Sequence, residues 1–173
     1  MDLGDNPFAM GDAQYLLRSL SQLSKLNYLD LLHAQLGLDD IHALSALIKP
    51  GGSLNNLIIG STTMTVTVVE EMVNVILQNS NLHNLSIMNL DLAQFGSHLG
   101  KRLQENKTLW TLMLWDRSFC IEGCVEVVRA LKKNDTLHSL TLIPWYRFHI
   151  PDSMFKSVRQ GRIKWFYYPE QNQ

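Results

Sequence analysis

Residues 82–87 read Leu-His-Asn-Leu-Ser-Ile, and the pattern L-x-x-L-x-[LI] within them returns at a nearly constant spacing along the chain. Five copies occupy residues 26–31, 54–59, 82–87, 109–114 and 137–142, with first leucines 28, 28, 27 and 28 residues apart. A partial copy precedes them, since Leu3 lies 28 residues before Leu31. A period of this length predicts a solenoid, in which each unit buries its apolar residues against its neighbours.

The segments between the motifs have apolar residues three and four positions apart, which predicts one apolar face on a helix. These residues are Ile41, Leu44, Leu47 and Ile48; Val66, Val69, Met72, Val73, Ile76 and Leu77; Phe95, Leu99 and Leu103; and Val125, Val128 and Leu131. Just before the next motif stand Gly51-Gly52, Asn79, Asn106 and Asn134. Because Gly and Asn tolerate the left-handed backbone conformation, we expect them to end the helices.

Strands joined by helices predict an α/β fold, here a right-handed solenoid of about six repeats, with a curved parallel sheet inside and helices outside. We expect a single domain over residues 1–173, with repeats in 1–143 and an atypical C-terminal capping unit in 144–173. Because strand side chains alternate, the motif leucines should point into the core. The third, fifth and seventh motif positions should then face the inner surface of the sheet.

The C-terminal segment departs from the period. Eight of the fifteen aromatic residues lie between Trp145 and Tyr168, beside five basic residues. A solenoid needs an atypical unit to close its apolar end, so we expect a short helix at Pro151–Gln160 and an edge strand at Arg162–Tyr168. Base stacking on these aromatics is the functional alternative. At the other end the first unit begins in mid-motif, which suggests either a fragment of a longer protein or a first strand that pairs with a partner.

Composition favours a globular domain, with 46% hydrophobic and 18% charged residues. The net charge of −1 gives no electrostatic reason to expect binding to nucleic acid or an anionic membrane. The longest apolar stretch, around Val66–Leu77, is interrupted by Glu70-Glu71 and is too short to span a bilayer. With two cysteines and no leader sequence, the expected location is a reducing compartment, the cytoplasm.

The sequence contains none of the common catalytic motifs, so we expect a non-enzymatic protein without a cofactor or metal. Cys120 and Cys124 lack a second Cys/His pair at a spacing suited to zinc, and we interpret them as small apolar residues where a turn meets a helix. His83 and His138 share the second motif position two repeats apart. At about 4.8 Å per strand they would lie about 10 Å apart, too far to share a metal, and they are expected at the surface.

The repeat resembles the ribonuclease-inhibitor-like subclass of leucine-rich repeats, over roughly residues 1–143. That subclass also occurs in NOD-like immune receptors, in the Ran GTPase activator and in effector proteins of intracellular bacteria. The resemblance implies a unit of strand, turn and helix, and a protein-binding role. Three residues past the last motif leucine the family prefers Asn or Cys; of the residues in that column, Asn6 alone keeps this preference.

The inner surface carries the functional prediction. Of its fifteen positions in the five complete motifs, only Asp30 is charged, although a sheet surface in water normally carries more charge. We therefore predict that a protein partner docks there, with Met113 and Trp115 as apolar anchors and Asn, Ser and Thr side chains setting its orientation. The predicted contact residues are Tyr28, Asp30, Asn56, Asn84, Ser86, Met88, Thr111, Met113, Trp115, Thr141 and Ile143.

Three interpretations of this surface remain open from sequence. The first is a protein–protein interaction scaffold that binds a separate partner. In the second, the chain is the C-terminal ligand-sensing or autoinhibitory domain of a NOD-like receptor, and another segment of the parent protein covers the surface. The third is a regulator of a GTPase, for which Arg117 is the one arginine near the rim at the strand ends.

Overall fold

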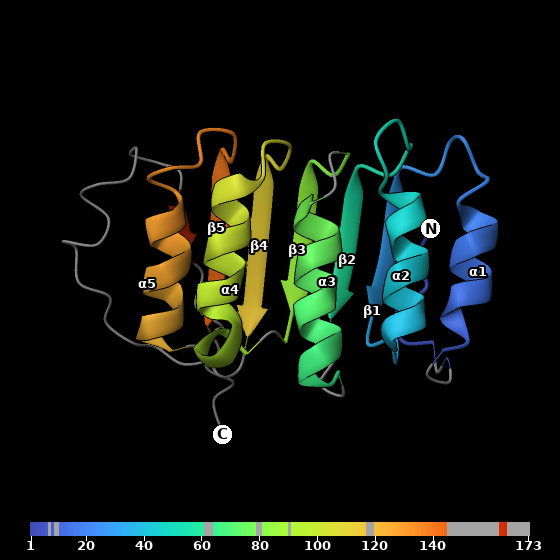
Figure 1. Ribbon diagram of the computed structural model, residues 1–173, viewed down its shortest axis with the longest axis horizontal. Coiled ribbons are helices and arrows are strands. Elements are labelled where there is room, and N and C mark those ends of the chain that lie inside the picture. Colours follow the sequence, from blue (N-terminus) through green and yellow to red (C-terminus); the bar gives the residue numbers. More distant parts are fainter. Residues whose placement is uncertain are drawn as a thin grey trace, which may run out of the picture.

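The computed structural model describes residues 1–6, 8, 11–60, 64–78, 81–89, 91–116, 120–144 and 163–165. Helices and strands alternate along most of these residues (Figure 1). The helices are α1 (Ala13–Leu20), α2 (Leu38–Leu47), α3 (Val66–Gln78), α4 (Leu92–Glu105) and α5 (Ile121–Ala130). The strands are β1 (Tyr28–Leu32), β2 (Asn56–Gly60), β3 (Asn84–Met88), β4 (Thr111–Asp116), β5 (Ser139–Pro144) and β6 (Ile163–Trp165).

The strands form one sheet in which every neighbouring pair is parallel and the spatial order follows the sequence. β1 to β5 each begin at the third position of a motif, which confirms the prediction of five parallel, sequential strands. β6 pairs with β5 and lies inside the edge strand predicted at 162–168. The helix predicted at 151–160 falls outside the described residues. This arrangement of a six-stranded parallel sheet and five helices, within the described part of the chain, is compatible with a solenoid.

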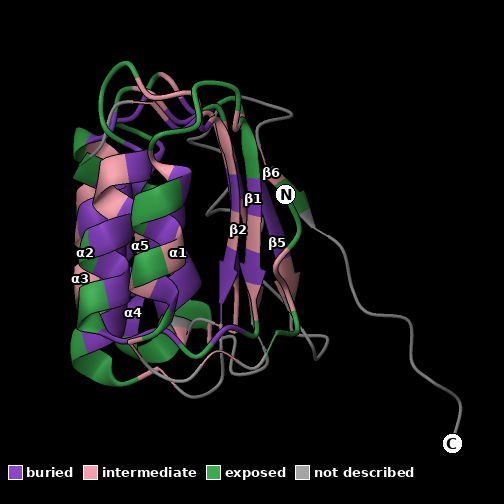
Figure 2. Cartoon of the chain, turned by 90° about the vertical axis from the view of Figure 1, so that its right-hand side faces the viewer, coloured by how far each residue is buried: buried purple, intermediate pink, exposed green. Residues whose placement is uncertain are grey.

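All five described helices lie on one side of the sheet (Figure 2). Between the two layers the motif leucines and isoleucines form the core, except Leu26, which is half-buried against it. Leu85 and Leu112, for example, are 1% and 0% exposed. Strand residues alternate between buried and more exposed along β1 and β3, as expected when one face of a sheet packs on helices. We call the opposite face, turned away from the helices, the open face.

The helical faces pack largely as predicted, with two corrections. Val66, the first residue of α3, is 46% exposed, and Val125 of α5 is half-buried. In α5 the stripe that meets the core runs through Cys124, Val127, Val128 and Leu131, and Val125 lies beside it on the helix surface. The motif spacing also did not predict α1, although its buried residues follow helical steps of four and three.

Asparagines at the ends of the helices act through their side chains. Asn106 has φ −70° and ψ 132°, so the prediction of a left-handed backbone there is wrong. The left-handed non-glycine residues among those described are Asp5, His33 and Asn89, so Asn134 departs from the prediction as well. Of the predicted helix ends, Gly51 has a positive φ of 77°. Asn79 lies outside the described residues.

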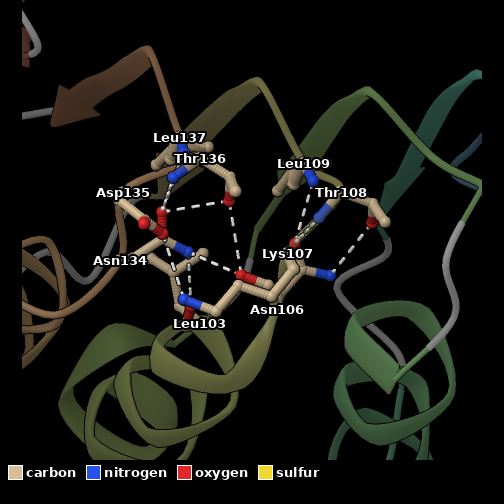
Figure 3. Close-up of polar contacts among 9 residues, drawn as sticks. All are labelled: Leu103, Asn106, Lys107, Thr108, Leu109, Asn134, Asp135, Thr136 and Leu137. Carbon is tan, nitrogen blue, oxygen red and sulfur yellow. Dashed lines mark hydrogen bonds and ion pairs between the residues drawn. The ribbon is translucent and has the colours of Figure 1, made fainter.

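The side-chain amides of Asn106 and Asn134 instead connect consecutive units. Figure 3 shows this connection for Asn134. Asn134 donates to the carbonyls of Leu103 (2.7 Å) and Asn106 (2.9 Å), and its oxygen accepts from the amides of Thr136 (3.1 Å) and Leu137 (2.7 Å). Asn106 donates to the carbonyl of Leu77 and accepts from the amides of Thr108 and Leu109 in the same way. Each buried asparagine therefore holds the start of one strand against the end of an earlier helix.

Glycines allow two helices to approach closely. A Cβ atom added to Gly96 of α4 would lie 2.5 Å from the Cα of Gly123 in α5, and one added to Gly100 would lie 2.8 Å from the carbonyl oxygen of Glu126. Such distances are shorter than van der Waals contact. The close approach of α4 to α5 therefore depends on glycine, which has no side chain, at positions 96 and 100.

A buried carboxylate fixes the first two helices to each other. Asp40 in the first turn of α2 is fully buried and accepts hydrogen bonds from the amides of Gly37 (2.8 Å), Gly11 (2.9 Å) and Gln14 (2.6 Å). The last two amides stand at the start of α1, where helix amides lack backbone partners. A buried charge requires such partners, so Asp40 sets how α1 packs on α2.

Candidate binding surface

The predicted contact residues share the open face because the strands pair without any shift of register. Each third-position residue is the Cα partner of the third-position residue on the next strand, as in Tyr28 with Asn56 and Asn84 with Thr111. The same holds for the fifth positions, from Asp30 on β1 to Thr141 on β5. The eleven predicted residues thus form adjacent rows.

Exposure within these rows is uneven. Tyr28 is 37% exposed, and nine of the other predicted residues are half-buried. The exception is Thr141, which is only 6% exposed, so the expectation that it faces solvent is wrong. Thr141 lies in register between Met113 and Lys164, whose longer side chains flank its short one.

The β1 edge of the open face is polar and acidic. The Tyr28 hydroxyl donates to Oδ2 of Asp30 (3.1 Å), and the amide of Leu32 donates to Oδ1 (2.9 Å). Desolvation, followed by the charge of Asp30, its hydrogen bond and the charge of Asp2, raises the pKa of Tyr28 above its ordinary value. The phenol therefore stays protonated, and able to donate this hydrogen bond, to a higher pH than an ordinary tyrosine.

The N-terminal residues add a second carboxylate to this edge. The segment from Met1 to Asp5 runs parallel to β1, and the amide of Leu3 donates to the carbonyl of Asp30 (3.0 Å). Asp2 is the partner of Asp30 in this pairing. This agrees with the 28-residue offset of the partial motif, and it places two acidic residues side by side.

The centre of the third-position row is an amide pair. Nδ2 of Asn84 donates to Oδ1 of Asn56 (2.7 Å), and Nδ2 of Asn56 donates to the carbonyl of Asn27 (3.0 Å). These bonds fix the orientation of both amides. Each amide can still form further hydrogen bonds, as donor and as acceptor, with a partner on this surface.

The apolar part of the open face spans the carboxyl ends of β3, β4 and β5. Met88, Trp115 and Ile143 are successive register partners, and Met113 lies one row away. All four are half-buried, so each presents part of its surface. The sequence therefore placed these four residues correctly on one face of the sheet. That they bind a partner stays a prediction.

A row of rings at the other end of the strands was not included among the predicted contact residues. Trp110 is 53% exposed and stands between His83 (ring centroids 4.3 Å apart) and His138 (6.4 Å). The three residues share the second motif position, just before β3, β4 and β5. The sequence showed this column, but the ring contacts also depend on the orientation of the side chains.

The two cysteines considered for chemistry lie at the start of α5 and within it. Cys120 is the N-cap of α5, where its Sγ accepts from the amide of Gly123 (3.2 Å), and Cys124 is buried in α5. Neither cysteine is part of a disulfide. Arg117 lies outside the described residues. Among the residues that the structure describes, no group of three or more His, Cys, Asp or Glu could hold a metal ion, and none of the helices could span a membrane.

A comparison of the chain with protein-family models and with curated proteins found no match. Function must therefore be inferred from the geometry and chemistry of the open face.

Proposed function

We propose that this chain is a non-enzymatic protein-binding module of the leucine-rich-repeat kind, and that its partner docks on the open face. The observation that carries the proposal is the composition of that face. Fifteen outward positions on β1 to β5 include one charged residue, Asp30, while Met88, Met113, Trp115 and Ile143 gather at one side. Depletion of charge together with Met and aromatic residues is typical of the centre of protein interfaces.

The repeat itself supports the assignment to leucine-rich repeats. The motif L-x-x-L-x-[LI] recurs every 27 or 28 residues, and each copy coincides with the start of a parallel strand. In this proposal the units form a right-handed solenoid of about six repeats, and residues 144–173 close its C-terminal end. The cytoplasm is the proposed location, because two cysteines that form no disulfide suit a reducing compartment.

Binding would proceed by burial of the apolar part of the open face. Met113 and Trp115 serve as anchors, because large side chains at the centre of an interface contribute most of the binding free energy. The amides of Asn56 and Asn84 and the hydroxyls of Ser86 and Thr111 set the orientation of the partner. A stable contact of this kind buries about 800 Å² on each side.

The test is a pair of measurements on Trp115→Asp: the midpoint of thermal unfolding and the capture of partner proteins by the immobilised chain. We expect unfolding to change little and capture to be lost, because the change puts a charge into a surface that must become dry. Tyr15→Asp is the matched control, since Tyr15 is 68% exposed on α1 in the helical layer. It should leave capture intact.

A second variant, Ser86→Arg, covers the case in which Trp115→Asp unfolds the chain. Ser86 is half-buried at the centre of the open face, so an arginine there can extend into solvent and block docking. If both variants fold and both still capture every partner, the open face is not the binding site.

A further inference from the structure

One register row crosses the whole open face and carries opposite charges at its two ends. Successive strand pairings connect Asp2 to Asp30 at one end of the row and Thr141 to Lys164 at the other. Between Asp30 and Lys164 the members are Ile58, Ser86, Met113 and Thr141, all uncharged. The row is thus acidic at β1, uncharged in the middle and basic at β6.

The charged ends are accessible to a partner. Asp2 and Lys164 are exposed and Asp30 is half-buried. The bonds from Tyr28 and Leu32 hold the Asp30 carboxylate in place, and a carboxylate with two such bonds still has lone pairs for a cation. From Asp30 to Lys164 the row makes five steps of about 4.8 Å, a span of about 24 Å.

A partner segment that lies across the strands must find hydrogen-bond partners for its own backbone N–H and C=O groups. Side chains cover the open face, so an extended peptide crossing it would find few backbone partners there and would leave its own N–H and C=O groups unpaired. An α-helix pairs these groups internally and presents side chains alone. At 1.5 Å per residue, a helix that spans about 24 Å has about 16 residues.

We propose that the open face binds an amphipathic α-helix of about 16 residues that lies along this row, with basic residues over Asp2 and Asp30 and acidic residues over Lys164. The apolar stripe of the helix contacts Ile58 and Met113 and extends toward Trp115. This proposal rests on the proposed function and adds to it the conformation, the length and the orientation of the partner segment. Complementary charges at the two ends select one direction of the helix and disfavour the reverse.

The experiment uses a displayed library of random 16-residue peptides, selected on the full chain and counter-selected on Trp115→Asp. Enriched peptides are expected to have helical apolar spacing, with Lys or Arg toward one end and Asp or Glu toward the other. The best peptide is then synthesised in two forms, one as selected and one with its basic and acidic residues exchanged. Fluorescence anisotropy should show binding weakened about tenfold or more by the exchange at low salt, with a smaller difference at 1 M salt.

A charge-exchanged chain tests the direction. It carries Asp2→Lys, Asp30→Asn and Lys164→Glu, where Asn keeps an acceptor for the Leu32 amide. This chain should prefer the exchanged peptide. The matched control carries Asp39→Lys and Lys101→Glu, two exposed residues of the helical layer, and should keep the original preference.

The outcomes separate this inference from the proposed function. The proposed helix and its orientation are overturned if enriched peptides lack charge polarity, lack helical spacing, or bind the original and the charge-exchanged chain alike. In that case, loss of capture in Trp115→Asp would still support the open face as a binding surface. If no peptide is enriched on the full chain over Trp115→Asp, the inference is overturned as well. Unchanged capture by Trp115→Asp and by Ser86→Arg, both folded, overturns the two proposals together.

Discussion

At the scale of single residues, the side-chain amide of Asn134 contributes a disproportionate share of the contacts between units. It is 1% exposed, donates two hydrogen bonds to residues of the preceding unit, and accepts three within its own loop. Asn134→Asp keeps the acceptor oxygens but removes both donors and places a charge beside two carbonyls. Because each unsatisfied buried group costs about 1–3 kcal/mol, we expect the free energy of unfolding to fall by about 3 kcal/mol or more in urea titrations.

Asn27→Asp is the matched control for this prediction, because the same chemical change occurs at an exposed residue. Its effect should stay within about 0.5 kcal/mol. Similar losses for the two variants would show that the bonds of Asn134 do not hold the units together.

At the scale of elements, the contact between α4 and α5 reverses the usual effect of a glycine replacement. In an ordinary helix, Gly→Ala stabilises by about 1 kcal/mol. Gly96→Ala should instead destabilise, because its Cβ would lie 2.5 Å from the Cα of Gly123 and the two helices would have to separate. We expect a lower midpoint of thermal unfolding, measured by circular dichroism.

Ser97→Ala, at the neighbouring exposed position of α4, provides the comparison. It adds no contact to α5 and improves helix propensity, so its midpoint should be unchanged or slightly higher. A midpoint for Gly96→Ala above that of the parent chain would mean that α4 and α5 pack less closely than described.

The elements also show what the sequence could and could not predict. The strands and most helices follow from local periodicity, because the alternation in residues 82–87 and the helical spacing from Phe95 to Leu103 are each contained in one short segment. The hydrogen bonds of Asn106 and Asn134 join backbone groups about 30 residues away, so they cannot be seen in a local pattern. The same reason applies to Asp40, whose partners Gly11 and Gln14 belong to another helix.

The candidate binding surface likewise has features that the sequence predicted and features that it did not. The alternation within each strand placed the predicted contact residues on one face, and the constant period placed them in rows. The burial of Thr141 and the rings around Trp110 depend on which side chains stand next to each other across strands. The constant period gives the register of those neighbours, but the size and orientation of the side chains, which the motif does not give, decide burial and ring contact.

At the scale of the whole molecule, β6 is the last strand of the sheet among the described residues and covers the edge of β5. It pairs with β5 through Leu140, Thr141 and Leu142, two of which belong to the core. Deleting residues 161–173 removes this strand and leaves β5 as an unpaired edge, so we expect a lower midpoint of thermal unfolding and more aggregation. A deletion of residues 170–173, which keeps Ile163–Trp165, should be harmless; equal midpoints for the two deletions would show that β6 does not protect the sheet.

The sequential order of the sheet has an evolutionary consequence. Because each strand pairs with the strands before and after it in sequence, an in-frame duplication of residues 82–108 would add a strand and a helix without rethreading the chain. Each duplication would move Lys164 about 4.8 Å further from Asp30. The length of the partner segment that fits between the two charges would then change in fixed increments, through recombination of whole units and without any change to the residues at either end.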